Sequence, residues 1–274
     1  DEPPSVLAAL RIAQGDFVIE YPPLSPNLQQ LVLTGLYGIL FIVQLVGGYV
    51  SSPEQFALTY QQDPTVFYLL ARGLSVLSSL LTLCILYRLV SKLRNRQTAI
   101  LAVFLLAFCF LDVRHSHFVE PYSLIALMAV ITAYAAIQYL SVKKLVWLLV
   151  SGIASGIGVG LRFSTAPLVV GPLLAIGLQF FRREDKPASK IRTLLVHVAL
   201  LLLSFVVGLL VGTPSLILNT RNSLSTAATQ IALAATAEGF WGFAFTDWPT
   251  WRFYGAILEI AWGMPVIIAI MLGF

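Results

Sequence analysis

Apolar residues occur along this 274-residue chain in long blocks, separated by short polar connections. A helix needs about 20 apolar residues to cross a bilayer, and several of the blocks reach or approach that length. The blocks occupy residues 28–50, 67–87, 98–111, 125–140, 145–161, 167–181, 193–212 and 255–274. The pattern therefore predicts an all-α fold, a polytopic transmembrane helix bundle.

The first 66 residues are predicted to form an outer loop with juxtamembrane helices. Apolar residues between Val6 and Ile12 share one helical face opposite Arg11, as in a helix that lies on a membrane surface. Residues 28–50 leave two interpretations open, because they are long enough to cross the bilayer but contain Gln29, Gln30 and Gln44. We favour a re-entrant or juxtamembrane segment over a full crossing.

The organisation that follows is one transmembrane domain over residues 1–274. After the first outer loop, residues 67–212 form the transmembrane helices, residues 213–254 a second outer loop, and residues 255–274 the start of a further helix. The chain opens at Asp1 and stops inside an apolar run. We therefore expect a fragment that lacks a preceding helix and a following region.

Composition supports an integral, multi-pass membrane protein. Hydrophobic residues make up 58% of the chain and charged residues only 11%, against about 25% charged residues in soluble domains. The mean hydropathy is +0.86. In this setting the formal charge of +4 is better explained by topology signals than by a nucleic-acid partner, and none is expected.

Basic residues gather in three of the polar connections and give the orientation. They are Arg88, Lys92, Arg94 and Arg96, then Lys143 and Lys144, then Arg182, Arg183, Lys186, Lys190 and Arg192. Cytoplasmic loops of membrane proteins are enriched in lysine and arginine, so all three clusters are placed in the cytoplasm. Counting crossings between them places the connection 112–124 on the extracytoplasmic side.

That connection contains a dense group of ionisable residues: Asp112, Arg114, His115, His117 and Glu120. Each such group at membrane depth must reach water, a partner or a substrate, so we interpret the connection as half of an active site. The two histidines are candidates to donate hydrogen bonds to a substrate, and the alternative is that they are ordinary polar residues of the connection. Two histidines two residues apart are a weak metal signal, so no metal site is assigned and a divalent metal stays an open alternative.

Arginines outside the basic clusters are candidate phosphate ligands, because the guanidinium group pairs with phosphate oxygens and stays charged when partly desolvated. The candidates are Arg72, Arg114, Arg162 and Arg221. For each of them the alternative is an ordinary ion pair or a side chain that snorkels at a helix end.

Several short motifs, taken in order, carry a resemblance to a known family. They are Asp1-Glu2-Pro, Gly15-Asp16, Tyr21-Pro-Pro-Leu, Ala71-Arg-Gly-Leu-Ser-Val-Leu-Ser-Ser, Ser116-His117-Phe-Val-Glu-Pro and Gly152-Ile-Ala-Ser-Gly-Ile-Gly-Val-Gly-Leu-Arg162. The chain resembles the GT-C type membrane glycosyltransferases, and within them the protein O-mannosyltransferase and lipid A aminoarabinose transferase branch. The resemblance implies a GT-C-like helix bundle.

The same resemblance implies roles for individual residues. Asp1 matches the catalytic base of the first outer loop and Glu2 its partner, while Tyr21 opens the matching Pro-Pro segment and contacts the substrate. Arg72 matches the arginine that opens the helix after this loop.

The second outer loop departs from the family pattern. Relatives place the second acid after the proline, where this chain has Tyr122, whereas Glu120 comes before Pro121. Glu120 either supplies the catalytic carboxylate from a shifted position or stabilises the start of the next helix through the helix dipole.

The predicted function is an inverting glycosyltransferase that moves a sugar from a polyprenyl-phosphate donor to an acceptor hydroxyl on the extracytoplasmic face. The acceptor is a protein, lipid or glycan, and the expected location is a prokaryotic plasma membrane rather than the endoplasmic reticulum. The alternatives are a transporter or flippase of lipid-linked sugars and a non-catalytic membrane subunit. A transporter needs ionisable groups deep within its helices and related halves, and here the charged groups lie at helix ends.

Overall fold

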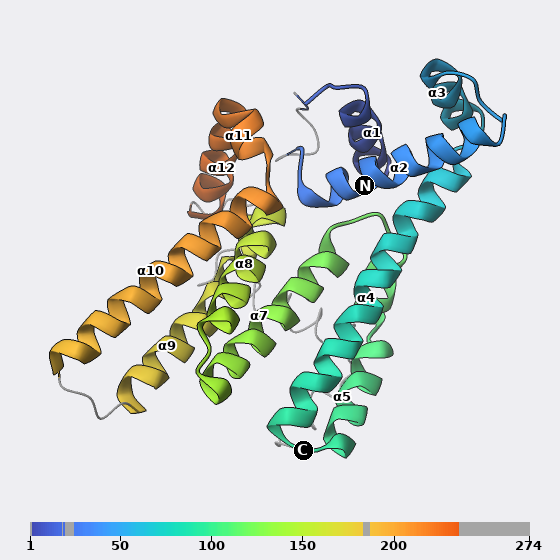
Figure 1. Cartoon of the computed structure of the whole chain (residues 1–274). Coiled ribbons are helices and arrows are strands. Elements are labelled where there is room, and N and C mark those ends of the chain that lie inside the picture. Colours follow the sequence, from blue (N-terminus) through green and yellow to red (C-terminus); the bar gives the residue numbers. More distant parts are fainter. Residues whose placement is uncertain (1, 18, 20–24, 183–186, 236–274) are drawn as a thin grey trace.

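The computed structural model describes residues 2–17, 19, 25–182 and 187–235, and every regular element in this part of the chain is a helix (Figure 1). The α-helices and one 3₁₀ helix are α1 (Glu2–Ala13), α2 (Leu28–Val46), α3 (Pro53–Gln62), α4 (Thr65–Leu93), α5 (Arg96–Ala107), α6 (Phe110–Ser116), α7 (Tyr122–Val142), α8 (Leu145–Leu161), η1 (Phe163–Val169), α9 (Val170–Arg182), α10 (Pro187–Gly212), α11 (Ser215–Leu218) and α12 (Thr220–Ala235). The predicted all-α polytopic bundle is confirmed.

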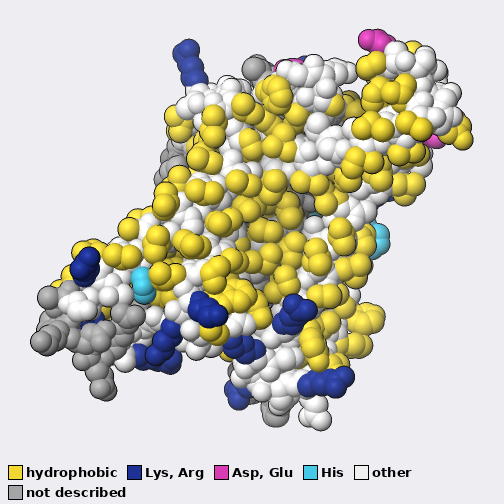
Figure 2. All heavy atoms as spheres, in the orientation of Figure 1, with side chains coloured by type: hydrophobic (Ala, Val, Ile, Leu, Met, Phe, Trp, Pro, Cys, Tyr) yellow, Lys and Arg dark blue, Asp and Glu magenta, His cyan; other side chains and the backbone are white. Residues whose placement is uncertain are grey.

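Helices α4, α5, α7, α8, α9 and α10 run side by side between two chemically different ends (Figure 1). Lysines and arginines gather at one end, here called the basic end (Figure 2). The acidic side chains that the structure describes belong to α1, α3, α6 and the connections beside them, at the other end, here called the acidic end. In the part of the chain that the structure describes, five helical segments, α2 among them, are long and apolar enough to cross a membrane.

The surface between the two ends is apolar. Leu69, Leu195 and Leu203 are each more than 60% exposed, and hydrophobic side chains cover the middle of the face in Figure 2. A soluble protein rarely exposes an apolar surface of this extent, so lipid chains must cover it.

Glycines hold the centre of the bundle together by letting α8 and α10 touch. A Cβ added at Gly156 would lie 2.1 Å from the Phe205 carbonyl oxygen, and one added at Gly208 would lie 2.1 Å from the Ile153 carbonyl oxygen. Neither position accepts a side chain without separating the helices. Small residues serve this purpose in membrane bundles because lipid provides no hydrophobic drive for helix association.

The apolar run predicted at residues 98–111 is not one straight helix. Asn95 caps α5 by accepting a hydrogen bond from the Thr98 amide, and the chain then bends by 64° between α5 and α6. Helix α6 contains residues 112–116 of the polar connection 112–124, which sequence reasoning had treated as a loop. Helix α6, which carries Arg114 and His115, packs against α4.

Helix α2 lies across the acidic end of the bundle (Figure 1). Pro26, before its first residue, accepts a hydrogen bond from Ser215, just beyond α10. Halfway along α2, the Tyr37 hydroxyl donates to the Phe67 carbonyl oxygen at the start of α4. Both partners belong to the acidic end, and on this ground we propose that α2 is a juxtamembrane helix. Asn27 and Gln30 start the helix with a reciprocal capping box.

The stretch predicted as an outer loop over residues 213–254 contains helices as far as the structure describes it. Its first part forms α11 and α12, which pack on each other beside the end of α10. The alanines and long side chains of residues 226–235 favour a helix, and an outer connection between membrane helices can contain one. The further helix predicted at residues 255–274 lies outside the described residues.

Candidate active site

The site begins with the position of α1, which carries Glu2 on its first turn. One face of α1 buries Val6 and Ala9 against Leu33 and Tyr37 of α2 and Phe67 of α4. The Thr34 hydroxyl of α2 also donates a hydrogen bond to the Ala9 carbonyl oxygen over 2.9 Å. The N-terminus of α1 is therefore held in place at the acidic end of α4.

Glu2 joins three separate parts of the chain. Its carboxylate accepts two hydrogen bonds from Arg72 of α4, from Nε over 3.1 Å and from a terminal nitrogen over 2.7 Å. It also accepts the Val119 amide over 3.0 Å. The hydrogen bond from Arg72 is the main reason why the pKa of Glu2 lies below its ordinary value, with the Val119 amide adding to it and burial opposing it. Glu2 is thus a fixed carboxylate, held by a bidentate pair.

The connection between α6 and α7 is attached to the same end of α4. Ser75 of α4 donates to the Phe118 carbonyl oxygen over 2.8 Å, next to the Val119 amide that binds Glu2. Pro121 precedes the first residue of α7 and suits a helix start, where its missing amide hydrogen has no role. Residues 118–121 are therefore held by α4 at one end and by the start of α7 at the other.

A second group of polar side chains continues from this connection toward α8. Nδ1 of His115 lies 3.3 Å from a carboxylate oxygen of Glu120. The His115 ring packs on the Tyr122 ring with centroids 4.5 Å apart. The Arg162 guanidinium sits 4.9 Å from the centre of the Tyr122 ring and also donates to its hydroxyl oxygen. Tyr122 is thus enclosed between a histidine and an arginine.

Both groups meet at a hollow of about 230 Å³ at the acidic end. Its walls are Glu2, Pro3, Arg114, His115, Phe118 and Glu120. The Arg114 guanidinium lies 6.0 Å from the centre of the Phe118 ring, and Arg114 forms none of the ion pairs found among the described residues. It is therefore the cation in this hollow that remains available to an anionic ligand.

The structure brings most of the predicted site residues together. Glu2, Arg114, His115 and Glu120 line the hollow, and Arg72 binds Glu2 beside it. Arg162 belongs to the adjoining group through Tyr122. Asp1 and Tyr21, the predicted base and one predicted substrate contact, lie outside the described residues.

Two further predicted residues take part neither in the hollow nor in the contacts around Glu2 and Tyr122. Nδ1 of His117 lies 2.7 Å from the Val113 carbonyl oxygen, so its ring is bound to the end of its own helix. Arg221 lies on α12, and none of the ion pairs in the described part of the chain includes it. The charge of Arg221 suggested a phosphate ligand, but position along the sequence could not show how far α12 lies from α6.

Sequence reasoning missed Tyr122, Phe118 and the Val119 amide. Tyr122 had one available signal, because it stands where relatives carry an acid. A backbone amide has no signal in sequence, because any residue supplies one. Among the described residues, no three His, Cys, Asp or Glu side chains come together in a metal-binding arrangement.

Comparison with known families shows to which class of protein the chain belongs. A family model described as dolichyl-phosphate-mannose-protein mannosyltransferase matches residues 69–211, just over half of the chain. The chain belongs to this family. No curated protein and no solved structure matches it significantly.

Membership in the mannosyltransferase family makes the chain a membrane glycosyltransferase, and the prediction of an enzyme is confirmed. Family members generally transfer mannose from a dolichyl-phosphate sugar. The matched region runs from α4 into α10 and includes Arg72, Arg114, His115, Glu120 and Arg162. Glu2 and Arg221 lie outside it, so the position of Glu2 in the site depends on its contacts alone.

Proposed function

We propose that this mannosyltransferase family member moves a sugar, mannose in the first instance, from a polyprenyl phosphate to a hydroxyl group of a protein. The reaction takes place in the hollow at the acidic end and inverts the anomeric carbon. One observation carries the proposal: Glu2, whose chain neighbour is Asp1, lines the same hollow as Arg114, His115 and Glu120.

Asp1 is the proposed base. The acceptor oxygen attacks the anomeric carbon of the sugar while the bond from that carbon to the phosphate oxygen breaks. The bonding electrons leave with the phosphate, and the acceptor proton passes to the Asp1 carboxylate. In an inverting transfer the base lies on the opposite face of the sugar from the leaving group. Glu2 positions Asp1, because Arg72 and Val119 fix the adjacent carboxylate.

Arg114 is the proposed partner of the departing phosphate. The phosphate gains negative charge as it leaves, and a fixed cation within reach stabilises that charge more in the transition state than before it. Arg72 and Arg162 are already bound to Glu2 and Tyr122, so they act as supports of the site. His115, held near Glu120, offers its second ring nitrogen as a further hydrogen-bond donor when protonated.

The basic end is proposed to face the cytosol, because its lysines and arginines follow the distribution found in cytoplasmic loops. The acidic end then faces the extracytoplasmic side, and a prokaryotic plasma membrane remains the expected location. The lysine and arginine side chains that gather at the basic end in Figure 2 support this orientation.

Sealed right-side-out vesicles that contain the full-length protein and polyprenyl-phosphate mannose test the proposal. A threonine-containing peptide added outside should acquire mannose, and nuclear magnetic resonance should show the anomer opposite to that of the donor. Inverted vesicles, which present the basic end to the added peptide, are the control. Transfer from the inverted vesicles alone, or a product that retains the donor's anomer, would refute the assignment.

A further inference from the structure

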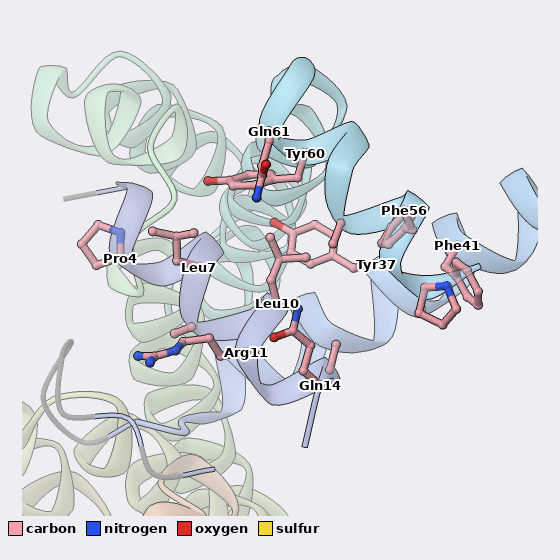
Figure 3. A pocket seen from close by; sticks show the side chains of 15 residues that line it. Pro4, Leu7, Leu10, Arg11, Gln14, Tyr37, Phe41, Phe56, Tyr60 and Gln61 are labelled. Atoms are coloured by element: carbon pink, nitrogen blue, oxygen red, sulfur yellow. The ribbon is translucent and has the colours of Figure 1, made fainter. Parts of the chain in front are cut away.

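A second cavity, larger than the hollow, lies at the acidic end between α1, α2 and α3. Its volume is about 760 Å³, within the range of about 300–1,000 Å³ that ligand-binding pockets occupy. We call it the α1–α3 pocket. Figure 3 shows Leu10 and Tyr37 at its centre, Pro4 and Leu7 on one side, and the aromatic side chains Phe41, Phe56 and Tyr60 on the other.

The α1–α3 pocket and the hollow lie on two sides of the start of α1. Pro3 lines the hollow and Pro4 lines the pocket, so the first turn of α1 borders both. An inverting transfer needs the acceptor and the departing phosphate on opposite sides of the sugar. With Arg114 assigned to the phosphate in the hollow, the pocket lies where a part of the acceptor can bind.

The lining of the pocket indicates what kind of acceptor fits. Gln14, just after α1, and Gln61 of α3 place amide groups at its edges, pointing in toward Leu10 and Tyr60 (Figure 3). A side-chain amide can pair with the N–H and C=O groups of a peptide backbone, for which a hydrocarbon chain has no counterpart. Aromatic-lined grooves of this kind are a common way of binding extended polypeptides.

The position of the pocket favours the same ligand. Helices α1 and α3 both lie above α2 in Figure 1, on the side of α2 away from the bundle. Arg11 is the one charged side chain among the described lining residues, and it already pairs with Asp16 over 3.4 Å. The pocket therefore offers apolar volume and neutral amides, facing away from the membrane-spanning helices.

We propose that the α1–α3 pocket is a specificity site that binds a bulky apolar or aromatic side chain of the acceptor polypeptide, close to the hydroxyl residue that receives the sugar. The inference rests on the proposed function and adds a preference to it. Burial of one large apolar side chain in such a pocket gives discrimination of about tenfold or more against alanine.

Gly38 of α2 provides a way to fill the pocket. It lines the pocket, and a Cβ added there would meet nothing within 4 Å, so Gly38→Leu places a side chain in open space. Gly35 is the matched control, because it lies on the same helix, its added Cβ also meets nothing within 4 Å, and it does not line the pocket. Both changes replace glycine in a helix, which favours folding.

The first measurement compares peptides with a single threonine, in which phenylalanine is moved from three residues before it to three after it. We expect kcat/KM at one or more positions to exceed that of the all-alanine peptide by about tenfold. Gly38→Leu should bring this ratio close to one, and Gly35→Leu should preserve it. Equal kcat/KM for all peptides would overturn the pocket while the proposed function stands.

The second measurement does not need turnover. A peptide that carries benzoylphenylalanine at the preferred position, or at each position in turn, is irradiated with the full-length protein in nanodiscs. We expect cross-links to residues 4–14 and 53–61, competed by the phenylalanine peptide, lost in Gly38→Leu and kept in Gly35→Leu. The absence of these cross-links would overturn the inference. Labelling of the same residues by a photoreactive phosphatidylcholine, without competition by the peptide, would also overturn it and assign the pocket to a lipid chain.

Discussion

Replacing Asp1 with asparagine should lower kcat for sugar transfer by about a thousandfold, within the range of about 10²–10⁴ that a positioned base contributes. Asparagine keeps the shape of the side chain but cannot take the acceptor proton. KM should change little, because the proton moves only during the reaction. The vesicle assay with a polyprenyl-phosphate sugar and a threonine peptide measures both constants.

Asp16→Asn is the matched control for this change. Asp16 follows α1, and its carboxylate lies 3.4 Å from Arg11 in an exposed ion pair, so it should retain nearly full activity. Undiminished turnover of Asp1→Asn would remove Asp1 as the base. Equal loss in both variants would show that acidic charge near α1 matters in general and would not support a specific base.

Breaking the pair between Glu2 and Arg72 should lower kcat by about a hundredfold, the cost of a misplacement of about 1 Å in a catalytic group. Glu2→Gln removes the charge and Arg72→Met removes both donors, and each change releases the start of α1 from α4. Since the two residues act through one contact, the double variant should be about as active as the worse single variant. Steady-state kinetics of the three variants give the coupling.

The stability that the Glu2–Arg72 pair contributes should depend on pH in a defined direction. Because its partners lower the pKa of Glu2, the stability that the pair gives is fully present above the ordinary pKa of glutamate and is lost as pH falls through the lowered value.

Glu54→Gln, on the first turn of α3, is the control for the Glu2 and Arg72 variants and should leave kcat unchanged. Losses in the two single variants that add up in the double variant would contradict a shared role.

Much of the fold follows from the sequence because the bilayer fixes the length and polarity of a spanning helix. Helix α8 has the bounds that its apolar run predicts, residues 145–161. The bend between α5 and α6 was missed, because both sides of it are apolar and no proline or glycine marks it. The placement of α2 needed tertiary contacts, since the same apolar run suits a spanning helix and a juxtamembrane one.

The site was predictable as a set of charged residues but not as an arrangement. Arg72 and Glu2 were both singled out from sequence, yet their bidentate pairing depends on how the first turn of α1 packs against α4. Arg221 carried the same signal as Arg114 and belongs to a different part of the fold. Charge and spacing select candidates, whereas packing decides which of them share a cavity.

The sugar-bearing phosphate is expected to bind in the hollow between α1 and the connection from α6 to α7. A polyprenyl phosphate with a photoreactive group in its first isoprene unit tests it directly. After irradiation and peptide mapping, the label should lie on residues 2–3 and 114–120 and should fall sharply in Arg114→Ala. Label found instead at the basic end, on residues 88–96 or 143–144, would contradict the account.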